Sequence, residues 1–114
     1  MSETTAFIQN GATQLFLAAV TPPTALQVLP TFTSGSRPRN QFRLVNAGTN
    51  NVFLGAGPTA AIAAANAAVV TANGNAVPLL PGAVEVFSFP PNWYFTASTA
   101  ADTSTIYITP GEGL

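Results

Sequence analysis

The chain has 114 residues, of which 47% are hydrophobic and only seven are charged, and it contains no histidine and no cysteine. Most catalytic and metal chemistry is excluded, because the side chains that titrate near neutral pH or bind transition metals are missing. We therefore expect no enzyme, no cofactor and no metal site. A formal net charge of -1 also gives no field that would attract free nucleic acid or an anionic membrane.

The length fits one domain. We expect an extended N-terminal arm over residues 1–12 and one domain over 13–114. Residues 1–10 lack a basic region followed by an apolar run, so no secretory signal is expected and synthesis is predicted in the cytoplasm. The alanine-rich tract at 59–72 is too short and too polar to span a membrane.

Proline and glycine interrupt the chain at short intervals, and the runs between them are rich in β-branched and aromatic residues. Seven or eight short strands spaced in this way predict an all-β fold. We expect a single antiparallel β-sandwich with jelly-roll-like connections. The predicted strands cover residues 13–20, 25–33, 41–46, 51–54, 84–89, 93–97 and 104–109.

The strands at 41–46 and 51–54 are separated by Ala-Gly-Thr-Asn-Asn, in which glycine and asparagine favour a tight turn. The sequence therefore predicts a hairpin between these two strands. Within the first of them, Phe42 and Leu44 share a face opposite Arg43.

Residues 59–68 are predicted to form one short helix, because Thr59 can cap its start and alanine has the highest helix propensity. The run Ala-Ala-Val-Val-Thr at 67–71 also fits a strand closed by Asn73 and Gly74. Both alternatives stay open for the second half of this segment.

Alternation in the last third of the chain indicates which side chains face the core. Ile106 and Ile108 point one way and Tyr107 the other. Glu85 should face solvent or a partner, whereas the pattern at 84–89 leaves open whether the valines or Phe87 are buried. Such alternation favours antiparallel sheets with one face buried and one face available.

A surface with so few charges repels its neighbours weakly, so we expect it to be covered by identical or different subunits. A neutral, threonine-rich monomer is the alternative. All three positive charges, Arg37, Arg39 and Arg43, lie within seven positions. These arginines form either a solvated loop or a contact loop that binds carboxylates of a neighbouring subunit. Glu112 in the acidic tail is a candidate for such a carboxylate. On the second reading, replacing Arg37 and Arg39 by alanine weakens assembly without unfolding the protein.

Trp93 and Tyr94 follow a rigid Pro-Pro-Asn turn and precede Phe95. By alternation, either Trp93 and Phe95 together or Tyr94 alone should be buried. An exposed ring at 93 or 94 would serve as an interface anchor or as a platform for a carbohydrate.

Three segments, 46–54 (NAGTNNVFL), 77–87 (VPLLPGAVEVF) and 106–113 (IYITPGEG), together resemble the small β-sandwich virion proteins of tailed bacteriophages. This group includes capsid decoration, or cement, proteins. The resemblance extends from Phe42 to the end of the chain and does not include the first 40 residues. It implies an assembly component that binds the major capsid protein on the outer capsid surface as a homo-oligomer, a dimer or trimer, and strengthens the shell after expansion.

The predicted function is therefore that of a structural virion protein located on the capsid surface. A neck or tail component of the virion is one alternative. A carbohydrate-binding module that uses Trp93 and Tyr94 is another.

Overall fold

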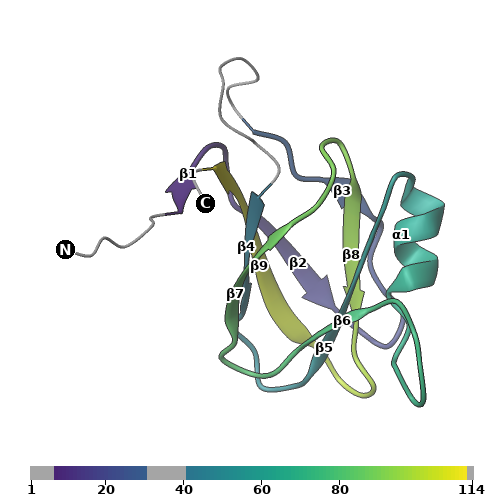
Figure 1. The fold of residues 1–114 in the computed structure, drawn as a ribbon. Coiled ribbons are helices and arrows are strands. Elements are labelled where there is room, and N and C mark those ends of the chain that lie inside the picture. The colour runs from purple at the N-terminus through teal and green to yellow at the C-terminus, as the bar shows by residue number, and fades with distance from the viewer. Residues whose placement is uncertain (1–6, 31–40, 113–114) are drawn as a thin grey trace.

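Short strands arranged in two antiparallel sheets form the framework of the fold (Figure 1). A computed structural model describes residues 7–30 and 41–112. Sheet A contains β1 (Ile8–Gln9), β2 (Gln14–Ala18), β4 (Gln41–Asn46), β7 (Val84–Ser88) and β9 (Ser104–Glu112). Sheet B contains β3 (Leu26–Gln27), β5 (Val52–Gly57), β6 (Val77–Leu79) and β8 (Tyr94–Ser98).

The strand pairing is nested, with the early strands of the domain joined to the late ones. β2 pairs with β9 and β4 with β7 in sheet A, while β3 pairs with β8 and β5 with β6 in sheet B. The pairs β4–β9 and β5–β8 complete the two sheets. Eight strands connected in this way form a jelly roll, which confirms the predicted all-β sandwich.

The core lies between the two sheets and is built from alternate residues of their strands. Phe42 and Leu44 are buried on the face opposite Arg43, and Ile106 and Ile108 are buried opposite Tyr107, as predicted. In β7 it is Phe87 that packs against the core, whereas Val84 is 59% exposed. The other large core side chains are Phe16, Val28, Val52, Leu54, Leu79 and Phe95.

The predicted hairpin between residues 41–46 and 51–54 is wrong. β4 pairs with β7 and β9 in sheet A, whereas the following strand, β5, pairs with β6 and β8 in sheet B. The turn between them therefore crosses from one sheet to the other. The buried amide of Asn46 holds this corner, because its Nδ2 donates to the carbonyl oxygens of Asn50 and Leu79, each at 2.9 Å.

The predicted helix is confirmed as α1 (Ala60–Asn66), where the Thr59 hydroxyl accepts a 3.2 Å hydrogen bond from the N–H of Ile62. The alternative strand at 67–71 is wrong, since this segment forms no strand and Ala67 caps the helix. No helix of the described residues combines the length and hydropathy needed to cross a membrane.

Two short strands were not predicted. β1 lies inside the predicted N-terminal arm and pairs with the end of β9, where Gln9 is opposite Gly111. β6 contains Pro78 and pairs with β5 at the margin of sheet B, a position that proline tolerates because its missing N–H is not needed there. β3 is shorter than the predicted 25–33, whose last three residues lie outside the described ones.

Candidate interaction surface

The outer face of sheet B is covered by other parts of the chain. α1 packs on β5 and β8, as Figure 1 shows on the right of the molecule. Asn66 donates from Nδ2 to the carbonyl oxygen of Ala56 at 2.9 Å, and the hydroxyl of Ser98 donates to the carbonyl oxygen of Ala67. Thr96, also on the outer face of β8, is fully buried and donates to the carbonyl oxygen of Pro23 at 2.6 Å. Hydrogen bonds therefore join sheet B to the segments that cover its outer face.

The outer face of sheet A carries apolar side chains that remain exposed. Leu15 lies opposite Tyr107, Tyr107 opposite Val45, and Val45 opposite Val84, so one row crosses four strands. We call these four residues the apolar row. Three of them are large and exposed, at 56% for Leu15, 37% for Tyr107 and 59% for Val84. Leu17, two residues along β2, lies on the same face and is also exposed.

A contiguous exposed apolar patch on a protein surface usually marks an interaction site, whereas single scattered apolar residues need no explanation. The row is built on the central and edge strands of one sheet, and its inner side is fixed by the buried residues Phe16, Leu44 and Ile106. The backbone that carries the row is therefore held in place before any partner binds, which lowers the entropy lost on association.

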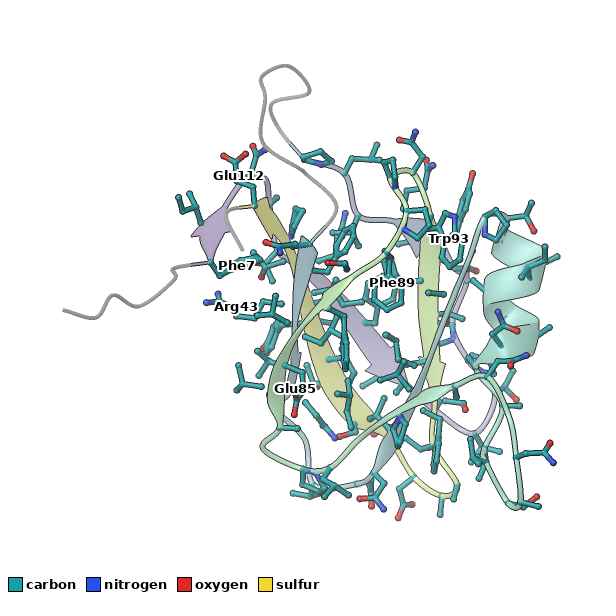
Figure 2. The ribbon with its side chains drawn as sticks, in the orientation of Figure 1. Phe7, Arg43, Glu85, Phe89, Trp93 and Glu112 are labelled. Atoms are coloured by element: carbon teal, nitrogen blue, oxygen red, sulfur yellow. The ribbon has the colours of Figure 1, made fainter. Side chains whose placement is uncertain are left out.

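Arg43, the one positively charged side chain among the described residues, lies on this face. It lies on β4, between Thr109 and Val86 in the row next to the apolar one. Its guanidinium Cζ is 5.5 Å from the centroid of the Phe7 ring, a cation–π contact (Figure 2). Its Nε is buried and makes no hydrogen bond within the described residues. Phe7 in turn covers Gly111, where a Cβ would collide with the ring.

The other predicted contact residues are dispersed. Arg37 and Arg39 lie outside the described residues. Glu112 is half-buried at the end of β9, opposite Ile8. Figure 2 shows Glu112, Phe7 and Arg43 on the same side of the molecule, with Glu85 further along. Glu85 is exposed, as predicted, although it lies opposite Leu44 on the side of β7 that faces the core.

Trp93 and Tyr94 belong to opposite faces of sheet B. Trp93 is half-buried beside Phe89, with ring centroids 6.3 Å apart, and so shares the inner side with the fully buried Phe95. Tyr94 lies opposite Gln27 and Gly57. Because neighbouring strand residues point in opposite directions, these two rings do not form one flat stacking platform.

Sequence reasoning missed Leu15, Leu17, Val45 and Val84 as surface residues. In Gln14–Ala18 four consecutive positions are apolar, so polarity does not distinguish the exposed face from the buried one. The available signal was the outward direction of Tyr107, from which the pairing of β9 would have located its neighbours.

Within the described residues, no three histidine, cysteine or acidic side chains gather as a metal site would require. No protein-family model matches the chain, and no curated protein or solved structure matches it either. The resemblance to phage virion proteins thus stays a prediction from sequence.

Proposed function

We propose that this protein is a structural virion protein that decorates the capsid of a tailed bacteriophage. In this proposal it binds the shell through the outer face of sheet A. The observation that carries it is the apolar row on the outer face of sheet A, formed by Leu15, Tyr107, Val45 and Val84. The outer face of sheet B, in contrast, is covered by α1.

The fold is compatible with this function, because jelly rolls occur in viral capsid proteins as well as in lectins. The surface favours the first group over the second. A lectin needs aromatic and polar groups that converge on a sugar, whereas Trp93 and Tyr94 lie on opposite faces of sheet B. Sheet A instead offers the exposed apolar row, which suits contact with another protein surface.

Burial of the apolar row supplies the driving force for binding. Removing a large aliphatic or aromatic side chain from water contributes roughly 1.5–3 kcal/mol when burial is complete. Each contact can remain individually weak, since a shell offers many equivalent sites and linked copies bind with avidity.

Arg43 supplies orientation. Its guanidinium is held at the margin of the apolar row by the ring of Phe7, and the side chain is half-buried. A carboxylate on the shell protein would pair with this group through a charge-assisted hydrogen bond. An apolar face without such a contact would slide, so Arg43 fixes the register of docking.

Co-sedimentation with expanded phage heads that lack the protein tests this proposal. We expect the wild-type protein to pellet with the heads and Val84→Lys to remain in the supernatant. Val69→Lys is the matched control, because Val69 is an exposed valine that follows α1 and lies outside sheet A. Wild-type protein that stays in the supernatant at micromolar concentration, or equal loss of binding in both variants, contradicts the proposal. If labelled protein is found at the neck or tail, the proposed location on the capsid is wrong and the protein is a component of that part of the virion.

A further inference from the structure

The open edges of the two sheets are protected to very different degrees. An edge strand presents unpaired N–H and C=O groups to solvent, and proteins usually block such edges with charge, proline or short length. β7 carries Glu85 on its core-facing side, β6 has three residues including Pro78, and β3 has only two residues. Each of these three edges therefore carries one of the usual protections.

β2 carries none of them. It has five residues, Gln-Leu-Phe-Leu-Ala, without charge, proline or glycine. It pairs with β9 along its whole length, and no other strand of the described residues pairs with the opposite side of Gln14–Ala18, although Ala19, which follows, forms a single parallel bridge to Ser98 of β8. Phe16 and Ala18 are buried beneath it, so the strand is held rigidly with its outer edge ready to accept a partner.

We propose that β2 pairs with β2 of a second copy of this chain, antiparallel and about a twofold axis at Phe16. In that register Leu15 of one copy lies opposite Leu17 of the other, and Gln14 lies opposite Ala18. Both leucines are about half exposed and lie on the outer face of sheet A, at 56% and 52%. The strand is thus complementary to itself, which is the requirement for a symmetric interface.

The register is specified by the side chains. A slip of one residue would bring the outward leucines to the inner side, because neighbouring positions face opposite ways. Directly opposed side chains in an antiparallel pair interact over about 4.5–5.5 Å between Cβ atoms. Leu15 of each copy therefore contacts Leu17 of the other, which gives two such contacts per dimer. A formal net charge of -1 per chain gives little repulsion between copies.

Such pairing joins two copies of sheet A into one continuous sheet with both apolar rows on the same side. If the protein binds a shell as proposed above, each dimer has two equivalent faces directed at it. This consequence rests on the proposed function, whereas the dimer itself does not.

Cross-linking tests the register directly, because the natural chain has no cysteine. Leu15→Cys and Leu17→Cys are prepared separately and then mixed under mild oxidation. We expect the mixture to form at least about tenfold more disulfide-linked dimer than either variant alone, since identical positions are diagonal neighbours about 7–8 Å apart and too far for a disulfide. Equal yields in the mixture and in the single variants, or equal self-linking of a Val84→Cys control, overturn the proposed register.

The solution mass tests the dimer without any capsid. We expect light scattering to give twice the chain mass of 11.7 kDa for the wild type and for Val84→Lys, and one chain mass for Leu17→Lys. The emission of Trp93 and far-UV circular dichroism show whether each variant is folded. A wild type that stays monomeric at high micromolar concentration overturns this inference. A dimer that does not bind phage heads contradicts only the proposed function. A monomer that binds the heads contradicts only the proposed dimer.

Discussion

The hydroxyl of Ser104 donates a 2.8 Å hydrogen bond to Oδ1 of Asn46, which connects the start of β9 to the end of β4. The same oxygen accepts a 3.1 Å hydrogen bond from the N–H of Gly48. With the two bonds donated by Nδ2 to Asn50 and Leu79, the amide uses its full capacity for hydrogen bonds. One fully buried side chain thus holds together segments from both sheets.

Asn46→Ala should therefore destabilise the fold strongly. Buried polar groups left without a partner cost about 1–3 kcal/mol each, and we expect a total loss of about 3–4 kcal/mol in the free energy of unfolding. Urea denaturation followed by Trp93 fluorescence measures this loss. Asn46→Asp is the matched variant, because it keeps the acceptor oxygen and loses both donors. A loss below about 1 kcal/mol for the alanine variant would show that water replaces the Asn46 amide as hydrogen-bond partner of the groups at this corner.

Phe89 is the centre of the aromatic cluster. Its ring centroid lies 6.0 Å from Phe42, 6.2 Å from Phe87, 6.3 Å from Trp93 and 5.3 Å from Phe95. Phe89→Ala should cost about 2–3 kcal/mol, less than a fully buried phenylalanine because this ring is half-buried. Trp93 is the only tryptophan, so its emission should shift to the red as its neighbour is lost. Unchanged emission in Phe89→Ala would contradict the packing of these two rings.

Gly55 permits the close approach of α1 to β5. A Cβ at this position would collide with the carbonyl oxygen of Ala63 and the N–H of Ala67. Gly55→Ala should therefore push the helix away and lower stability by about 1–3 kcal/mol. Gly74→Ala is the control, because its Cβ would meet only the Val70 side chain, at 3.2 Å. Equal melting temperatures for the two variants would show that the helix is not held against the sheet.

Thr59 caps a helix of only seven residues. Thr59→Ala should cost about 1 kcal/mol, because the N–H of Ile62 loses its acceptor. Thr59→Ser keeps a hydroxyl and should retain most of the stability. Amide hydrogen exchange at Ile62 reports the effect at the site itself, and faster exchange is expected in the alanine variant alone.

Local patterns predicted the elements that depend on local chemistry. The cap at Thr59, the buried faces of Phe42 and Leu44, and the outward position of Tyr107 follow from propensity and alternation. The failed hairpin depended on distant residues instead. Turn chemistry at 47–51 is equally compatible with a hairpin and with a corner, and the partners that select the corner, Leu79 and Ser104, lie 33 and 58 positions from Asn46.

The candidate surface was predictable only in part for a related reason. Tyr107 was expected on the available face, but its neighbours Leu15 and Val45 come from strands far away in the chain. Their proximity follows from the nested strand order, which no short stretch of sequence reveals. Arg43 was identified by charge alone, whereas its contact with Phe7 depends on the pairing of β1 with β9.

The pairing of β2 with β9 also sets the order in which the molecule can be completed during synthesis. Gln14 lies opposite Ile108, which is 94 positions later in the chain. Contacts between such distant residues form slowly, because a long loop must close before they stabilise anything. A ribosome adds about 5–20 residues per second, so β2 waits several seconds before its partner is made. Throughout that interval its apolar side chains have no sheet to pack into, so β2 is a binding site for a chaperone that shields nascent chains.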